Sequence, residues 1–398
     1  MGPGGALTGL RFPVSCFLFF IFFSRESPTG CLYMTTDAAI TRIMNGTSWA
    51  DFCDALKRAG DVILRDDSPR DPFDRAEGFR YLSRLTRVAL ESYIECADPL
   101  APVLRRPAHE TVKIGADNPD NYYQSAAISG QHEYRIWGTR GTVHYLGIGT
   151  YAGNYGSSAR SGQTGYLEGR ELHLAPDGSF EIIVSCQQRP GNWLRMEPDT
   201  SSLIVRQTFQ DRETERIADL HIERLGADGP PKPITAEFVD RGLAAASAYV
   251  AGTAALFADW AEGFAKRGIN QLHALDPAVA GAAHGDPHIF YFHGYWELGS
   301  DEALIIETTP PQCEYWNFQL NNHWMESLDY RYHRIAVNHH GAAYRPDGSV
   351  RIVVAHADPG VDNWLETAGH RRGTMCWRWI RADVHPRPAA RVVKLDDL

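Results

Sequence analysis

The sequence predicts an α+β protein, mainly β, built from two tandem jelly-roll-like β-sandwiches that are each preceded by a helical segment. Three observations predict this fold. Two stretches carry apolar residues at helical spacing, the stretches after them carry short β-rich runs separated by turns, and one strand-and-turn pattern occurs twice. At 398 residues the chain is too long for one ordinary core, so two domains are expected.

The first 33 residues are excluded from the fold prediction. Residues 12–23 form an apolar run of the length of a signal-peptide core, too short to span a bilayer. Arg25 and Glu26 separate this run from the candidate lipoprotein sequence Thr29-Gly30-Cys31, and Met34 begins a sequence typical of a cytoplasmic start. We expect a cytoplasmic protein with an over-extended start, and export through the apolar run is the second choice.

Residues 34–110 are predicted to form the first helical segment. Ser48 begins a capping-box-like sequence, in which its side chain can accept from the amides of the first turn. Apolar residues recur at helical spacing over 52–63 and again over 76–97, which predicts two helices. Prolines then end the second helix: Pro99, Pro102 and Pro107.

Residues 111–225 are predicted to form the first sandwich. Its expected strands are 122–128, 133–137, 142–148, 166–174, 180–186 and 202–209. Residues 147–169 are rich in Gly and Ser. This stretch lacks both a Gly-Lys-Ser/Thr sequence and a strand–loop–helix context, so we expect a loop between strands and not a phosphate site.

A Gly- and Pro-rich linker at 226–233 separates the halves. Residues 234–280 are predicted to form the second helical segment, with one long Ala-rich helix over 235–266. Residues 281–398 are predicted to form the second sandwich, which carries the candidate site. Its expected strands are 288–297, 303–307, 315–320, 332–338, 350–356 and 374–381.

The two halves share a sequence pattern. Residues 176–184 and 346–354 both begin Pro-Asp-Gly-Ser and continue as an apolar strand, at an offset of 170 residues. Asn-Trp-Leu follows each of them, at 192–194 and 363–365. This order predicts duplication of a helix-plus-sandwich unit. Trp193 and Trp364 are expected to be core anchors, and the Asn before each is expected to cap the adjoining turn.

The strand that begins Pro-Asp-Gly-Ser, followed by Pro-Gly-x-x-Asn-Trp-Leu, resembles the bacterial proteins of the domain-of-unknown-function family 1214. The likeness is clearest over about 314–380 and weaker in the first half. It implies a jelly-roll-like sandwich. It implies no reaction, because the family has no settled activity.

Composition limits the partners. A net charge of -10 argues against nucleic acid and anionic membranes, so we expect a small-molecule ligand and no membrane contact beyond the N-terminal signal-like run. The seven cysteines form no C-x-x-C pair, and we expect them to be reduced. No dinucleotide, flavin or nucleotide motif occurs, so no cofactor is expected. No metal is assigned either, because the His-rich region lacks a His-x-His pair with a downstream carboxylate.

The candidate site lies in residues 314–340, which have no counterpart in the first half. One side of the strand predicted at 315–320 and the residue after it would present polar groups: Tyr315, Asn317, Gln319 and Asn321. The other side would present Trp316, Phe318 and Leu320 to the core. The polar row suits a ligand surface that forms hydrogen bonds, and a solvated outer face is the alternative.

Acid–base chemistry is assigned to His323, Asp329 and His333, because a carboxylate can orient and polarise an imidazole. If the segment is extended, Asp329, Arg331 and His333 lie on one side of it. The alternative is an Asp–Arg ion pair that closes a turn and leaves His333 exposed. The remaining predicted ligand contacts are Trp324, Arg331, Trp364, His370 and Arg371.

These residues support an enzyme of hydrolase or lyase type with its pocket in the C-terminal sandwich. The alternative is a non-catalytic module that binds a carbohydrate, an aromatic compound or a lipid-like compound through stacking and amide hydrogen bonds. A structural or interaction protein is a third hypothesis. The enzyme hypothesis requires His323 or His333 within hydrogen-bond reach of Asp329 in an enclosed pocket.

Overall fold

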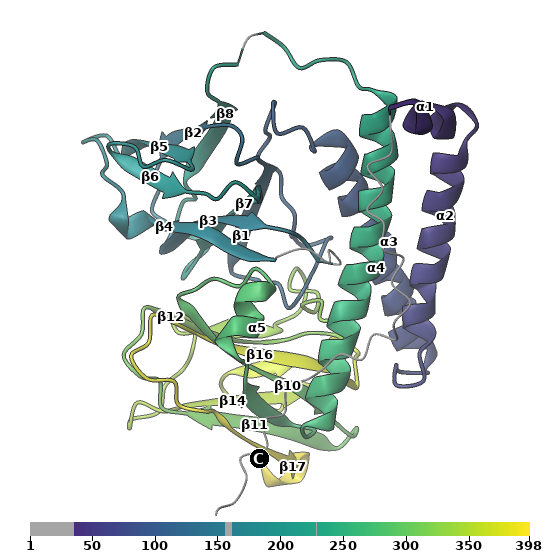
Figure 1. The fold of residues 1–398 in the computed structure, drawn as a ribbon. Coiled ribbons are helices and arrows are strands. Elements are labelled where there is room, and N and C mark those ends of the chain that lie inside the picture. Colours follow the sequence, from purple (N-terminus) through teal and green to yellow (C-terminus); the bar gives the residue numbers. More distant parts are fainter. Residues whose placement is uncertain (1–35, 156–160, 228) are drawn as a thin grey trace, which may run out of the picture.

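The computed structural model describes residues 36–155, 161–227 and 229–398. The signal-like run and the start near Met34 lie outside the described residues. The fold class is confirmed as α+β, mainly β, with four four-stranded sheets and a layer of helices beside them (Figure 1).

The helices of both halves form one layer. They are α1 (Thr36–Met44), α2 (Thr47–Ala59), α3 (Pro72–Leu90) and α4 (Ala236–Lys266), and the first three all contact α4 (Figure 1). A 3-10 turn, Gly60–Leu64, follows α2, and a π-helical turn, Glu91–Glu95, follows α3. Phe52, Tyr81 and Leu85 share one apolar core with Leu243 and Val250 of α4. Burial of these faces against one another stabilises helices that would be marginal alone.

The predicted capping function of Ser48 is wrong. The residue before α2 is Gly46 at φ 78°, which has no capping side chain, and the Thr47 amide donates to Oδ1 of Asn45 over 3.0 Å. The Ser48 hydroxyl instead donates to Asp240 of α4 over 2.5 Å. The side chain that the pattern assigned to a local cap therefore forms a tertiary contact with α4.

Helix α4 agrees with the long helix expected over 235–266. Thr235 caps it by accepting from the Phe238 amide at 3.2 Å. By length and composition α4 could cross a membrane, but half of its most apolar window is buried inside the protein. Its contacts are those of a helix that packs in a protein core.

The first unit contains two sheets. Its inner sheet has the order β1-β7-β3-β4, and its outer sheet has the order β6-β5-β2-β8. The strands are β1 (Asn121–Ala127), β2 (Tyr134–Thr139), β3 (Tyr145–Ala152), β4 (Gly162–Glu168), β5 (Ser179–Ser185), β6 (Asn192–Arg195), β7 (Thr200–Thr208) and β8 (Asp219–Arg224). Apolar side chains of both sheets, such as Ile136, Ile148 and Val205, form the core between them.

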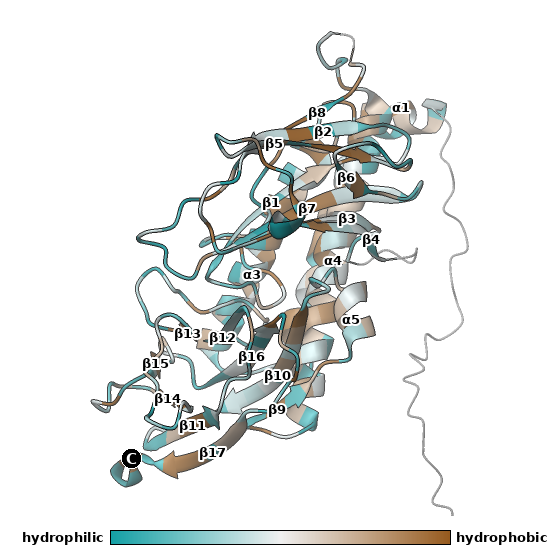
Figure 2. Cartoon of the chain, turned by 90° about the vertical axis from the view of Figure 1, so that its left-hand side faces the viewer, coloured by the Kyte–Doolittle hydropathy of each residue, from teal (hydrophilic) through white to brown (hydrophobic). Residues whose placement is uncertain are grey.

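The second unit repeats this order. Its inner sheet is β10-β16-β12-β13, and its outer sheet is β15-β14-β11-β17. The strands are β10 (Ile289–Glu297), β11 (Glu302–Thr308), β12 (Tyr315–Leu320), β13 (Ala336–Asn338), β14 (Val350–Ala355), β15 (Trp364–Glu366), β16 (Arg372–Ile380) and β17 (Ala389–Lys394). A short strand, β9 (Gln271–Ala274), and helix α5 (Pro277–Ala282) connect α4 to β10. Figure 2 shows apolar residues concentrated on the strands and on α4, and polar residues in the loops.

Each strand of the first unit thus has a counterpart in the same sheet position of the second, from β1 and β10 to β8 and β17. The duplication that would explain this match stays a prediction. The jelly-roll designation is not confirmed. Two pairs of neighbouring strands, β5–β6 and β14–β15, run parallel, whereas jelly rolls are antiparallel.

The repeated Asn-Trp-Leu element is structural, but the predicted anchor is wrong. Leu194 and Leu365 are fully buried, while Trp193 and Trp364 are only half-buried. The amide of Asn363 donates to the Ala343 and Arg351 carbonyls and accepts from the Ala343 amide, and Asn192 makes the matching three bonds with His173 and Glu181. Each Asn therefore joins two chain segments, which is more than the predicted cap of one turn.

Candidate functional site

The polar row predicted on β12 is buried inside the protein. Asn317, Gln319 and Asn321 have no exposed surface, and neither does Tyr315. The opposite residues Trp316, Phe318 and Leu320 lie in the core, as predicted. Gln319 and Asn317 accept from one guanidinium, that of Arg378 on β16, over 2.5 and 3.3 Å. The amide row therefore orients a neighbouring arginine and does not itself face an open surface.

His323 and Trp324 lie against the helical layer. The Nδ1 atom of His323 is 2.8 Å from the Tyr295 hydroxyl, and burial lowers the pKa of the imidazole to about 4. Trp324 is buried among the helices, and its indole N–H donates to the Asp74 carbonyl over 3.0 Å. Trp324 therefore attaches the loop to α3, and His323 attaches it to β10.

Asp329, Arg331 and His333 do not form an extended row. Residues 330–333 form a turn, closed by two hydrogen bonds from Arg331 to Asp329 of 2.9 and 2.7 Å. These bonds lower the pKa of Asp329 to about 2. The His333 ring instead pairs with Glu366 at 2.9 Å. Within the described residues, neither His323 nor His333 has a side-chain hydrogen bond to Asp329, so the geometry that the enzyme hypothesis requires is not found.

The remaining predicted contacts are dispersed. Trp364 packs on the outside of the outer sheet with Ala303 and Val353. His370 is buried edge-on against Phe73 of α3, with ring centroids 4.7 Å apart, whereas Arg371 is exposed. None of the predicted site residues lines the cavity described below.

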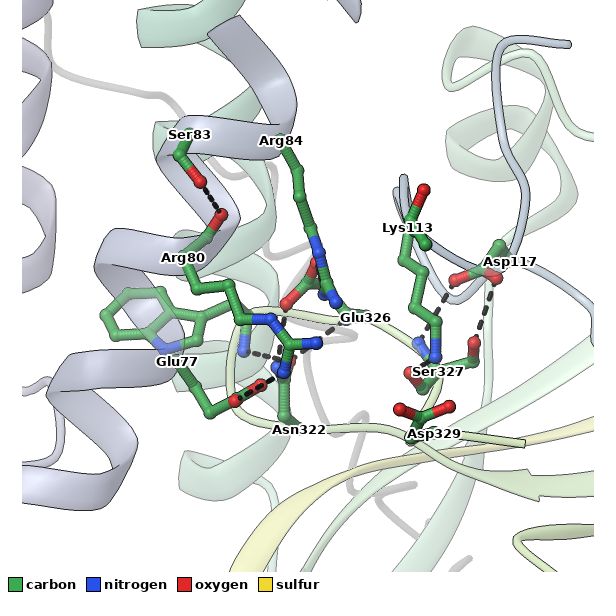
Figure 3. A network of polar contacts seen from close by, with 12 residues as sticks. Glu77, Arg80, Ser83, Arg84, Lys113, Asp117, Asn322, Glu326, Ser327 and Asp329 are labelled. Atoms are coloured by element: carbon green, nitrogen blue, oxygen red, sulfur yellow. Dashed lines mark hydrogen bonds and ion pairs between the residues drawn. The ribbon is translucent and has the colours of Figure 1, made fainter. Parts of the chain in front are cut away.

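A buried polar network explains why the loop between β12 and β13 is so rich in polar residues (Figure 3). Glu326 accepts from Arg84 of α3 over 2.6 Å and from Asn322 over 2.9 Å. Lys113 donates to the Ser327 and Leu328 carbonyls over 2.6 and 2.5 Å. Such groups are buried only when hydrogen-bonded, and here their bonds join the loop to α3 through Arg84 and to the segment before β1 through Lys113.

The two inner sheets face each other through reciprocal contacts. The Tyr145 hydroxyl of β3 donates to Asp286, which precedes β10, over 3.1 Å. The equivalent hydroxyl of β12, Tyr315, donates to Asp120, which precedes β1, over 2.5 Å and is 3.4 Å from Asn118. Each unit therefore contacts the segment that enters the other unit's inner sheet.

A cavity of about 310 Å³ lies at this interface. Its walls come from β1 and β7 of the first unit, β10 and β16 of the second, α4, and the segments that precede β1 and β10. The volume is within the range of about 300–1,000 Å³ typical of small-molecule sites. Aromatic and apolar side chains form much of the wall, including Tyr155, Tyr249, Phe257, Trp260 and Ile204.

Each unit contributes an equivalent Tyr–Arg pair to the cavity wall. Tyr123 of β1 is the cross-strand partner of Arg206 on β7, and Tyr291 of β10 is the partner of Arg378 on β16. Cross-strand partners project from the same face of a sheet. The cavity is thus lined by matching positions of the two units.

The segments before β1 and β10 hold these arginines reciprocally. Arg378 donates to the Ala116 carbonyl and Arg206 to the His284 carbonyl, and Ala116 and His284 both have positive φ, 57° and 58°. At Gly115, with φ 61°, a Cβ atom would lie 2.5 Å from the Phe257 ring. Close packing of this turn on α4 therefore requires glycine.

Both arginines are buried, with 9% of Arg206 and 4% of Arg378 exposed. Their acceptors are neutral: two carbonyls, two amide oxygens and the Tyr151 hydroxyl at 2.9 Å. Neither forms an ion pair with any carboxylate in the described chain. Asp117 also lines the cavity, but it accepts from Ser327, and burial raises the pKa of its carboxyl group.

Two histidines of the cavity are neutral at pH 7. Burial lowers the pKa of His284 to about 4 and that of His293 to about 3. The Nδ1 atom of buried His293 has no hydrogen-bond partner in the described residues. Among these residues, no group of three His, Cys, Asp or Glu side chains is arranged to hold a metal ion.

Sequence reasoning missed the cavity residues. One signal was available: the offset of 168 residues that relates Asn118-Pro119 to Asp286-Pro287 also relates Tyr123 to Tyr291 and Ala116 to His284. A second signal was a single arginine between tryptophans, Trp377-Arg378-Trp379, in a strand with both faces buried. Neither signal shows that the two inner sheets meet.

Comparisons with protein families and with solved structures found similar proteins. A family model described as protein of unknown function DUF1214 matches residues 303–383. The chain is similar to an uncharacterized protein from Burkholderia cenocepacia seen in a crystal structure, with 53% identity over 90% of this chain and 99% of that one, at a TM-score of 0.88. The VPA0106 protein from Vibrio parahaemolyticus covers 80% of this chain at 14% identity and a TM-score of 0.46, too distant for an inference about function.

Comparison with curated proteins gave no match. The predicted resemblance is confirmed by the family model in the C-terminal half, and the Burkholderia protein extends the likeness over nearly the whole chain. The chain therefore contains a DUF1214 region at residues 303–383, and over nearly its whole length it is similar to the Burkholderia protein.

Proposed function

We propose that this protein binds a small organic molecule in the cavity between its two inner sheets. The observation that carries the proposal is the cavity itself, which equivalent strands of both units line with tyrosine and arginine pairs. Apolar walls with a few convergent polar groups are typical of ligand sites. The tyrosines can present both a flat apolar face and a hydroxyl group to such a ligand.

Binding has more support than catalysis. The enzyme hypothesis requires a contact between Asp329 and His323 or His333, and those side chains have other partners. In the cavity, His284 and His293 have pKa values of about 4 and 3, far below the range in which a general acid or base works best at neutral pH. Neutral imidazoles here can serve as hydrogen-bonding groups for a ligand.

Ligand-observed NMR with a panel of neutral and anionic aromatic and aliphatic fragments tests the proposal. Ile204 lines the cavity, so Ile204→Trp should fill part of it and weaken the bound fragments by about ten-fold or more. Trp364→Ala and His333→Ala change the site predicted from sequence, and both should leave binding unchanged. Thermal unfolding of each variant shows whether it is folded.

The opposite pattern contradicts the proposal. If fragments bind Ile204→Trp as they bind the unchanged protein, and Trp364→Ala or His333→Ala weakens them, the ligand lies in the C-terminal sandwich. Mass spectrometry of the native protein, before and after denaturation, would also reveal a molecule that co-purifies with it.

A further inference from the structure

The cavity contains an imbalance of charge. Its wall includes two buried guanidinium groups, Arg206 and Arg378, that have only neutral hydrogen-bond acceptors within the described residues. The unfolded chain would leave both charges in water, and burial without a hydrogen-bonded ion pair costs free energy. Asp286 acts through space on Arg206 and Asp117 on Arg378, but neither carboxylate accepts a hydrogen bond from these arginines. The rest of the protein does not share this local excess, since the net charge is -10.

The arginines also retain unused donors. A guanidinium has five N–H groups. Arg206 donates two hydrogen bonds and Arg378 donates three to described residues, which leaves three and two N–H groups without a protein acceptor. The fork of N–H groups on arginine matches the oxygens of a carboxylate or a phosphate.

Neighbouring carboxylates do not take these donors. Asp117 accepts from the Ser327 amide and hydroxyl over 3.0 and 2.9 Å. Asp286 accepts from Tyr145 and Tyr166 and from the His288 amide. The protein therefore provides the cavity with positive charge but with no anion of its own at hydrogen-bond distance from either arginine.

Both arginines are also fixed before a ligand arrives. The side-chain oxygens of Asn317 and Gln319 accept from Nη1 of Arg378, and the Ala116 carbonyl accepts from Nη2. Tyr151 and the His284 carbonyl hold Arg206. Side chains that are fixed in this way lose little conformational entropy on binding.

We propose that the cavity takes an organic anion, a carboxylate or a phosphate ester with an apolar body, whose charged group is bound by Arg206 and Arg378. This inference rests on the proposed function and adds the class of ligand. The equivalent positions of the two arginines suit an anion placed between the units, and Phe257, Ile204 and the tyrosines suit its apolar body.

Calorimetric titration of the full chain with four probes tests the proposal. The probes are 3-phenylpropionate, phenylsuccinate, phenyl phosphate and the neutral 3-phenylpropionamide. At least one anion should bind about ten-fold to hundred-fold more tightly than the amide, which corresponds to charge-assisted hydrogen bonds.

The phosphate and carboxylate probes distinguish the two kinds of head group. If phenylsuccinate binds more tightly than 3-phenylpropionate, each arginine binds its own carboxylate. If the two bind equally, both arginines bind the same carboxylate.

Arg206→Gln and Arg378→Gln should each abolish most of the preference for anions and leave the affinity for the amide within about two-fold. The matched control is Arg331→Gln, since Arg331 pairs with Asp329 away from the cavity and this change should have no effect. If a Gln variant does not fold, Arg378→Lys and Arg206→Lys keep the charge, lose the fork and should retain only part of the preference.

Two failures are distinguishable. If the amide binds the unchanged protein as tightly as every anion, and Ile204→Trp weakens all four probes, the cavity is a ligand site but the inference of an anion is wrong. If Ile204→Trp leaves the binding of every probe unchanged, or no probe binds at all, the proposed function fails together with the inference.

Discussion

Arginine side chains lie in three different environments in this protein. Arg80 forms a partly exposed pair with Glu77, Arg84 forms a buried pair with Glu326, and Arg378 is buried with neutral acceptors only. The same residue type thus stabilises a helix surface, joins a loop to the helical layer, and provides positive charge to the cavity. Burial and partner, not residue type, separate these cases.

The first prediction concerns the buried pair. Arg84→Ala should lower the free energy of unfolding by about 3–5 kcal/mol, because Glu326 would be left buried without its charged partner. Arg80→Ala removes an arginine from the same helix and should change the free energy of unfolding by less than about 1 kcal/mol. Urea unfolding monitored by circular dichroism measures both. Equal losses of unfolding free energy would show that the buried Arg84–Glu326 pair stabilises the protein no more than the partly exposed Arg80–Glu77 pair does.

The second prediction concerns pH. Burial, together with Asp71, raises the pKa of Asp74 to about 7 from an ordinary value of 3.8. Because the folded state holds this proton more tightly, the contribution of Asp74 to stability falls as pH rises from about 4 to about 7. Asp74→Asn cannot ionise, so its stability relative to the unchanged protein should increase through this window.

Chemical unfolding at pH 4 and pH 8 checks this difference. The exposed Asp66 is the control, and Asp66→Asn should show no comparable change between the two pH values. A stability difference for Asp74→Asn that is the same at both pH values would mean that Asp74 ionises normally in the folded protein.

At the scale of single elements, the asparagine of each Asn-Trp-Leu motif joins two segments of its unit by hydrogen bonds. Asn363 is buried and joins Ala343, before the Pro-Asp-Gly turn, to Arg351 on β14. Asn192 does the same in the first unit. A side-chain amide can make these bonds because it both donates and accepts.

The third prediction follows from these bonds. Asn363→Ala should lower the free energy of unfolding by about 2–3 kcal/mol, since backbone groups would lose their partners. Asp362→Ala, at the exposed neighbour, should change it by less than about 0.5 kcal/mol. Thermal and urea unfolding measure both, and a loss below 1 kcal/mol for Asn363→Ala would contradict the assigned function.

At the scale of the whole molecule, the two halves are interlocked. The helices before the first unit pack on α4, which precedes the second, and Trp324 of the second unit lies in their common core. The two units also exchange contacts at their inner sheets, at Tyr145 with Asp286 and at Tyr315 with Asp120. Each half therefore buries part of its apolar surface against the other half.

The fourth prediction is that the protein unfolds in one cooperative transition. Most tryptophans of the sandwich cores lie in the second unit, including Trp316, Trp377 and Trp379, while the signal at 222 nm reports mainly on the helices. The thermal midpoints of tryptophan fluorescence and circular dichroism should therefore coincide. Two separated midpoints would show that the units unfold independently.

Local pattern was enough for many elements of this fold. Alternation placed 315–320 as a strand with Trp316, Phe318 and Leu320 in the core, and the Ala-rich pattern located α4 to within a residue. Pattern missed the short strands β6, β9 and β15, and residues 332–335 form turn and loop where a strand was expected. It also missed β8 and β17, which are six residues long but are partly exposed edge strands. Short strands carry too little periodicity to be distinguished from loops.

The sequence by itself determined that this protein is mainly β, that a pattern recurs after about 170 residues, and that it resembles the DUF1214 family. Each of these depends on residues close together in the chain. Only the tertiary structure decided where polar residues face. It buried the amide row of β12 beneath Arg378 and brought Arg206 to the same cavity, because the meeting of two inner sheets depends on contacts between residues far apart in sequence.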